Sequence, residues 1–351
     1  MNCFFRVNSG PTIGSGHFIR SFNLAQKLVE HGWDCYFISD SIFPRHTAML
    51  ENIGIRHSLF TNSKVNVTEA MKELKEIAIS FGEEDIDWLV VDDYKIDAKW
   101  DTPAKLVCKA LMVIEDVHKE VRDCDILLDM NYRTLESSLS LQSKYTNTKL
   151  LMGPKFALLD ERFENLRKTK ITKGLSNDQC LLIYFGSVDD YSLTLNTYIL
   201  TREKFPNLRI RIVIQQNSKD FSKIVELVGL DNENTELFIN PDFLGDIMSP
   251  CTIAVGAGGI SLWERLSLGI YCINVATADN QEVPLEELHK DGAIRYLGAA
   301  ESFAQDRLLA EICTALTRGN IQIHSKSDVL LVCDGLGTER VVSIMASHST
   351  F

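Results

Sequence analysis

The sequence lacks any apolar run of the roughly 18–20 residues that a helix needs to span a bilayer. It also lacks the basic segment, apolar core and small-residue cleavage site of a secretion signal, because residues 1–6 lead directly into a strand-like run. We therefore expect a cytoplasmic protein that does not insert into membranes.

Cysteines are scattered, and no two of the nine have the C-x-x-C spacing. Most lie inside apolar runs, as Cys35, Cys180 and Cys272 do, and there they read as small buried hydrophobes. An odd number without regular spacing argues against both a disulfide framework and a zinc site. The cysteine pattern therefore predicts no zinc site. We also expect no other metal and no cofactor.

Positive charge is also scarce. The 351 residues include 36 Lys and Arg against 48 Asp and Glu, for a formal net charge of −12, and no basic cluster is visible. A nucleic-acid-binding protein is expected to show a basic surface, so we do not expect nucleic acid as a partner. Small anionic ligands are not excluded, because backbone N–H groups at helix N-termini bind phosphates without net positive charge.

Short apolar segments alternate along the chain with longer segments of helical period. The strand-like runs lie at 3–7, 33–38, 88–91, 111–114 and 124–128, and again at 180–185, 209–214, 235–239, 252–255 and 271–275. Such alternation indicates parallel sheets covered on both faces. We predict an α/β protein with two Rossmann-like domains facing each other across a cleft. The domains are expected at 1–155 and 179–351, with a linker at 156–178.

The first candidate site is the turn Gly14-Ser15-Gly16, which precedes His17 at the start of the first helix. Glycines there let the backbone turn sharply and approach a ligand. Residue 19 is Ile, so the third glycine of the dinucleotide fingerprint is missing, which disfavours NAD and a dehydrogenase. The helix dipole disfavours a charged ring at His17, and a neutral imidazole suits general-base work. A histidine that only caps the helix or lines the turn is the alternative.

A second glycine-rich turn contains Gly256, Gly258 and Gly259, and the helix that follows carries Glu264. Backbone N–H groups of such a turn form a phosphate cradle. Glu264 could then accept hydrogen bonds from ribose hydroxyls. The alternative is a tight strand–helix turn with a solvated Glu264.

Other strand ends carry polar residues with open roles. Tyr94 belongs to the segment 91–94, at the end of the strand-like run 88–91, and either bonds a substrate hydroxyl or packs. Asp92 and Asp93 are adjacent, so they point to opposite faces and are not a ready metal pair. For Glu115 and Asp116 we favour a structural role.

Two turns of the second domain leave a similar choice. Asn280 and Gln281 follow a strand at the edge where open α/β sheets bind ligands, although such residues are also common in turns. In the turn at 186–190, Asp189 or Asp190 either caps a helix or binds a ligand.

Taken in order, these motifs resemble the PseG family of nucleotide-sugar hydrolases. In the first domain the resemblance rests on Arg6, residues 13–17 with Arg20, and the segments 91–94, 123–131 and 151–159. In the second domain it rests on 256–259, 263–265, 268–269, 279–281 and 334–337. The resemblance therefore covers nearly the whole chain.

The resemblance implies a GT-B-like fold, which MurG-type glycosyltransferases share. It also implies hydrolysis of a UDP-linked 2,4-diacetamido-2,4,6-trideoxyhexose to UDP and free sugar, as in pseudaminic-type nonulosonic acid biosynthesis. His17 would activate water for inverting attack, with Tyr94 and Asn280 lining the sugar site. Gly258 and Gly259 would hold the diphosphate. The implied substrate-binding set is Gly14, Ser15, Gly16, Gly186, Ser187, Gly256, Gly258, Gly259, Glu264 and Gln281.

The chain departs from the family pattern at two places. Asn8 stands where the family usually has Asp, and Gly-Ser-Val-Asp-Asp at 186–190 replaces Gly-Gly-Ser-Asp-Pro. These departures leave the sugar open. A glycosyltransferase with a UDP-sugar donor remains an alternative, because it needs the same cradle and base. A non-catalytic nucleotide-sugar-binding protein is a further alternative.

Overall fold

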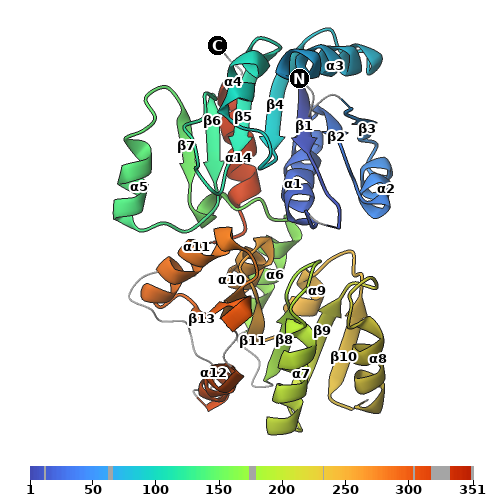
Figure 1. Ribbon diagram of the computed structural model, residues 1–351, viewed down its shortest axis with the longest axis vertical. Coiled ribbons are helices and arrows are strands. Elements are labelled where there is room, and N and C mark those ends of the chain that lie inside the picture. Colours follow the sequence, from blue (N-terminus) through green and yellow to red (C-terminus); the bar gives the residue numbers. More distant parts are fainter. Residues whose placement is uncertain are drawn as a thin grey trace. The chain divides into compact units, whose positions relative to one another are not determined.

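The computed structural model describes residues 1–11, 13–61, 66–173, 179–231, 233–302, 305–317 and 333–348. It divides into two compact units, each built on one parallel sheet (Figure 1). The first unit comprises Met1–Leu159 and Leu336–Phe351, and the second comprises Asp160–Gly335. None of the described helices is long and apolar enough to cross a bilayer.

The first unit contains a seven-stranded parallel sheet in the order β3-β2-β1-β4-β5-β6-β7. Its strands are β1 (Asn2–Val7), β2 (Asp34–Ser39), β3 (Arg56–Leu59), β4 (Ile86–Asp92), β5 (Cys108–Ile114), β6 (Ile126–Asp129) and β7 (Lys149–Met152). Its helices before the second unit are α1 (Gly16–Glu30), α2 (Pro44–Asn52), α3 (Val67–Ser80), α4 (Ala98–Lys105), α5 (Leu135–Gln142) and the 3₁₀ turn η1 (Pro154–Phe156). The chain reverses direction across the sheet between β1 and β4. This reversal is a topological switch point, where open α/β sheets bind ligands.

Both faces of this sheet are covered, which is why its inner strands are largely apolar, whereas the edge strand β3 is polar. All six residues of β1 are buried. Phe4 belongs to a cluster with α3 and α4 residues such as Leu74 and Trp100. Phe5 points the other way and stacks on Phe37, which in turn contacts Phe18 of α1. Side chains alternate along a strand, so Asp92 at the end of β4 faces α1 whereas Asp93 faces the opposite side.

The second unit repeats this design with six parallel strands in the order β10-β9-β8-β11-β12-β13. Its strands are β8 (Cys180–Tyr184), β9 (Arg209–Ile214), β10 (Thr235–Ile239), β11 (Ile253–Ala257), β12 (Tyr271–Ala276) and β13 (Arg295–Ala299). Its helices are α6 (Arg162–Lys173), α7 (Leu193–Lys204), α8 (Phe221–Leu230), α9 (Gly245–Met248), α10 (Ile260–Ser267), α11 (Asp279–Lys290), η2 (Ala300–Ser302) and α12 (Gln305–Thr317). The reversal between β8 and β11 creates a second switch point, beside the turn that opens α10.

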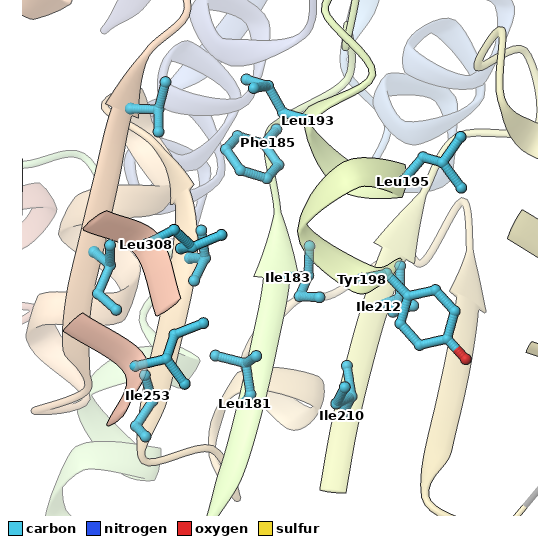
Figure 2. Close-up of a cluster of buried hydrophobic side chains, with 14 of the residues drawn as sticks. Leu181, Ile183, Phe185, Leu193, Leu195, Tyr198, Ile210, Ile212, Ile253 and Leu308 are labelled. Carbon is cyan, nitrogen blue, oxygen red and sulfur yellow. The ribbon is translucent and has the colours of Figure 1, made fainter. Parts of the chain in front are cut away.

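One face of the second sheet carries a continuous apolar core (Figure 2). Leu181 and Ile183 of β8 lie beside Ile210 and Ile212 of β9, and Tyr198 of α7 covers them. All these side chains are buried. The alternating large apolar residues of adjacent strands therefore hold this unit together, as the strand pattern of the sequence predicts.

The boundaries of the units differ from the expected domains. The predicted linker at 156–178 contains helix α6, which belongs to the second unit, while residues 174–178 lie outside the described part. The predicted second domain reaches the end of the chain, whereas α14 (Gly337–His348) returns to the first unit. Thr338 Oγ donates to Leu159 O at 2.7 Å, and the ring of His348 lies 5.5 Å from Trp88 of β4. Helical periodicity shows that α14 buries one face, but not which sheet it covers.

Candidate active site

The turn between β1 and α1 brings His17 to the edge of the first sheet. Gly14 has φ +80° and donates to Gly10 O at 2.7 Å, which closes the turn. A side chain at Gly16 would meet nothing within 4 Å, so that position is open. Ser15 Oγ accepts a 2.6 Å hydrogen bond from Arg45. His17 therefore stands in the first turn of α1, directly across the switch point from the end of β4.

The imidazole of His17 pairs with a buried carboxylate rather than capping the helix. His17 Nδ1 lies 2.6 Å from Asp92 Oδ1, and the two side chains are 14% and 1% exposed. Arg20 Nη2 also lies 3.1 Å from Nδ1, but the carboxylate contact is shorter and charge-assisted, so we assign the Nδ1 proton to Asp92. In this tautomer Nε2 carries the lone pair and is the nitrogen able to accept a proton.

Asp92 stays ionised despite its complete burial. Burial opposes its charge, but Arg20 and His17 outweigh this effect and hold the pKa of Asp92 well below its usual range. Arg20 donates from Nε to Oδ2 at 2.6 Å and from Nη2 to Oδ1 at 2.5 Å. Ser21 Oγ donates to Oδ2 at 3.2 Å. The carboxylate is thus rigidly held and presents one edge to the imidazole.

Asp116 and Tyr94 complete the cluster. Arg20 Nη1 donates to Asp116 Oδ2 at 2.7 Å, and the Tyr94 hydroxyl donates to the same oxygen at 2.5 Å. The Tyr94 ring stands edge-on to His17 with centroids 4.4 Å apart. Desolvation and the neighbouring Asp116 raise the pKa of Tyr94, which keeps its hydroxyl protonated. Asp92 and Asp116 together carry two negative charges, whereas Arg20 carries one positive charge. A proton on His17 therefore brings the net charge of these four groups to zero.

The structure brings together two of the three predicted catalytic residues, His17 and Tyr94. Asn280 lies in the second unit, in the first turn of α11. The sequence reasoning missed Asp92 as the partner of His17, and it assigned Asp116 a structural role. A usable signal for Asp92 was present: it ends an apolar strand, and in a doubly wound sheet such a strand can adjoin β1.

Asn8 accounts for one departure from the family pattern. Its amide nitrogen donates to Asp93 Oδ2 at 2.7 Å and to Asp40 Oδ2 at 3.3 Å. Its oxygen accepts from Arg6 Nη1 at 3.0 Å and from the backbone N–H of Asp40 at 2.7 Å. An aspartate at this position would add a third carboxylate to Asp40 and Asp93. The amide is therefore matched to its surroundings and holds the ends of three strands together.

In the second unit, the glycines of the 256–259 turn have different roles. A Cβ on Gly256 would lie 2.1 Å from Tyr184 O, so close strand packing requires this glycine. The N–H of Gly258 donates to Gln281 Oε1 at 3.1 Å, an oxygen that also accepts from the N–H of Thr277 at 3.1 Å. Gly259 is the N-cap of α10, and a Cβ there would meet nothing within 4 Å. Gly259 is therefore the glycine of this turn that combines open space with the start of a helix.

Glu264 is buried rather than solvated. It is 5% exposed, and its Oε2 has no hydrogen-bond partner among the described residues. Desolvation, together with the negative charge of Asp160, raises its pKa to about 7 in spite of the neighbouring Arg265. Arg265 instead donates to Ala257 O at 2.5 Å and to Ser261 O at 3.0 Å. Within the described part of the chain, Oε2 of Glu264 therefore lacks the partner that a buried acceptor normally has.

The turn after β8 separates into a bend and a helix cap. Gly186 has φ +99°, a conformation that favours glycine, and Ser187 follows it. Asp189 accepts from the backbone N–H groups of Leu193 and Thr194 at 2.9 and 2.8 Å, so it caps α7. This resolves the choice for Asp189 in favour of the structural role. Within the described residues, no group of three or more His, Cys, Asp or Glu side chains is placed to hold a metal ion.

No family model matches the chain. Spore coat polysaccharide biosynthesis protein SpsG of Bacillus subtilis is 20% identical over 249 residues, which cover 70% of each chain. UDP-2,4-diacetamido-2,4,6-trideoxy-beta-L-altropyranose hydrolase of Campylobacter jejuni is 22% identical over 293 residues, 83% of this chain and 97% of that protein. At this distance, the resemblance to the PseG hydrolases is that of a remote relative.

Solved structures match over almost the full length. MurG of Acinetobacter baumannii superposes with a TM-score of 0.64 at 12% identity, and the match covers 99% of both chains. UDP-GlcNAc 2-epimerase of Neisseria meningitidis, bound to UDP-GlcNAc, has a TM-score of 0.60 at 13% identity and matches over 99% of this chain and 100% of that one. The chain has a GT-B-like fold. The predicted fold class is thereby confirmed, while these identities carry no conclusion about the reaction.

Proposed function

We propose that the protein hydrolyses a UDP-linked 2,4-diacetamido-2,4,6-trideoxyhexose, with His17 as the general base on water. The pairing of His17 with Asp92 is the observation that carries this proposal. It leaves Nε2 of His17 free to accept a proton. Protonation of the ring brings the net charge of the cluster of His17, Arg20, Asp92 and Asp116 to zero. The name of the Campylobacter jejuni relative supports the choice of substrate.

The reaction balances without a further reactant. His17 Nε2 takes a proton from water while the water oxygen forms a bond to the anomeric carbon. The bond from that carbon to the phosphate oxygen breaks, and its electron pair leaves with UDP. Attack opposite to the leaving group inverts the configuration. Asp92 orients the ring and stabilises the imidazolium, the role that a buried carboxylate has beside a catalytic histidine.

The second unit supplies the proposed nucleotide contacts. Gly259 at the start of α10 offers open backbone N–H groups and the positive end of a helix to the diphosphate. Ribose hydroxyls are suitable donors for Glu264, whose Oε2 has no protein partner among the described residues. In the first unit Tyr94 would contact the sugar, and in the second Asn280 would do so.

A glycosyltransferase is the second candidate, because transfer of the sugar needs the same phosphate cradle and the same base as hydrolysis. In that reaction the same His17 would take the proton from an acceptor hydroxyl instead of water. The chemistry at the base is identical, so the distinction lies in what attacks the anomeric carbon.

Incubation with the UDP-sugar in the absence of any acceptor tests the proposal. We expect UDP and free sugar to appear in equal amounts, with the inverted anomer seen first by proton NMR. The matched control for a His17→Asn variant is His31→Asn, since His31 lies exposed at the end of the same helix. If release requires an acceptor sugar, the transferase is correct. Tight binding without turnover would leave a non-catalytic binding protein.

A further inference from the structure

A second histidine–aspartate pair lies at the same edge of the first sheet. His118 Nε2 is 2.9 Å from Asp129 Oδ2, and these side chains are 8% and 0% exposed. Asp129 is the last residue of β6 and also accepts from the side chain of Arg133 and from the backbone N–H of Asn131. The hydrogen bonds from Arg133 and Asn131 fix the carboxylate of Asp129. Asp129 in turn holds the His118 ring in one orientation, with Nε2 as the donor.

The two pairs flank the same strand. Asp92 ends β4, Asp129 ends β6, and β5 lies between them. Adjacent strands are about 4.8 Å apart, so the ends of β4 and β6 are separated by roughly 10 Å. The loop after β5 links them: Asp116 bonds Arg20 and Tyr94, and His118 follows two residues later. This spacing is comparable to the length of a hexose with its substituents.

One ring nitrogen of His118, Nδ1, has no hydrogen-bond partner among the described residues. With Nε2–H donated to Asp129, Nδ1 carries a lone pair, and it is buried without a hydrogen-bond partner among the described residues. An unsatisfied buried acceptor is unfavourable, and such atoms in native proteins call for a partner. The backbone of His118 also has φ +53°, and two N–H groups donated to Glu115 Oε1 hold this turn in place. The loop thus holds the ring in a position where none of the described residues donates a hydrogen bond to Nδ1.

We propose that His118 is a specificity-determining residue whose Nδ1 accepts a hydrogen bond from an N–H or O–H group of the substrate hexose. This inference rests on the proposed function, because it assumes that the sugar lies at this edge of the first unit. It assigns the two pairs different tasks. His17 receives a proton in the reaction, whereas His118 recognises a donor on the sugar and takes no part in bond breaking.

Two substitutions separate recognition from a purely structural role. In His118→Gln the side-chain nitrogen replaces Nε2 and keeps the bond to Asp129, but no acceptor remains at Nδ1. In His118→Asn the side-chain oxygen replaces Nδ1, and the bond to Asp129 is lost. For UDP-2,4-diacetamido-2,4,6-trideoxyhexose we expect the Gln variant to raise KM roughly ten- to hundredfold with little change in kcat. The Asn variant should lower the melting temperature and change KM less.

A structural role predicts the reverse pattern. A Gln variant with wild-type KM, or an Asn variant whose KM rises as far as that of the Gln variant, would overturn the proposal. If His118→Asn does not fold, the KM of His118→Gln decides alone. UDP by itself should bind all variants equally, and His31→Gln is the surface control.

Binding separates this proposal from the hydrolase reaction. In a His17→Asn background, calorimetry gives the ratio of the Kd values for UDP and for the UDP-sugar. We expect His118→Gln to reduce that ratio tenfold or more, and an unchanged ratio refutes the role of His118. Failure of the wild type to release UDP refutes the hydrolase proposal, while the binding ratio still decides the role of His118.

Discussion

Replacing Glu264 by Gln should stabilise the second unit in alkaline solution while weakening UDP binding. Glu264 is 5% exposed, its Oε2 lacks a partner among the described residues, and desolvation raises its pKa from 4.5 to about 7. A raised carboxyl pKa means that the folded state binds the proton more tightly than the unfolded state. Its contribution to stability is therefore complete in acid and is lost as the pH rises through about 7.

The magnitude follows from the two pKa values. Each pH unit between 4.5 and about 7 changes the free energy of unfolding by about 1.4 kcal/mol, so the whole window amounts to about 3 kcal/mol. Glutamine has the shape of the protonated acid and does not ionise. We therefore expect Glu264→Gln to match the wild type near pH 4.5 and to exceed it by about 3 kcal/mol at pH 8.5.

Urea unfolding between pH 4.5 and 8.5 measures this difference. Trp263, next to Glu264 on α10, reports on the second unit when the other three tryptophans, all in the first unit, are replaced by Phe in every protein compared. Glu286→Gln on α11 is the control, because that side chain is 52% exposed. Parallel pH profiles for wild type and Glu264→Gln, or a less stable variant at pH 8.5, would refute the reasoning.

The same substitution tests the nucleotide contact. Ribose hydroxyls that donate to Glu264 favour its ionised form, so UDP binding by the wild type at pH 7 should release up to about half a proton per site. Calorimetry in buffers of different ionisation enthalpy measures that release. The Gln variant should release none and bind UDP roughly ten- to hundredfold more weakly, because a hydrogen bond to a charged group is lost. Unchanged UDP affinity would remove Glu264 from the site.

Three further predictions concern the first unit and the reaction. His17→Asn should lower kcat by about 10²–10⁴-fold and leave UDP affinity intact, as calorimetry will show; a variant with wild-type kcat would mean that another group activates water. Activity should persist after treatment with EDTA. Loss of activity in EDTA that is reversed by adding Mg²⁺ or Mn²⁺ would contradict the metal-free reaction. Asn8→Asp should lower the free energy of unfolding by about 1–3 kcal/mol at pH 7, because Asp40 and Asp93 lose a donor and gain a like charge; equal stability in urea would show that the amide is dispensable.

Local sequence determined the elements and several of the site residues. Runs such as 180–185 and 252–255 are largely apolar because both faces of a parallel sheet are covered, so composition alone indicated strands and the α/β class. Glycine-rich turns also leave a local signature. They indicate, without any long-range contact, that His17 lies at the start of α1 and Glu264 within α10.

Tertiary structure decided how those pieces meet. Asp92 is 75 residues from His17 in the chain, and only the strand order, with β4 beside β1, places its carboxylate 2.6 Å from the ring. The side chain of Gln281 accepts a hydrogen bond from the N–H of Gly258, which lies 23 residues away in the chain. Helix α14 likewise returns to the first unit. Each of these contacts joins segments that are distant in the chain. Periodicity and turn chemistry describe neighbours along the chain, so they cannot specify which distant partner a buried polar group finds.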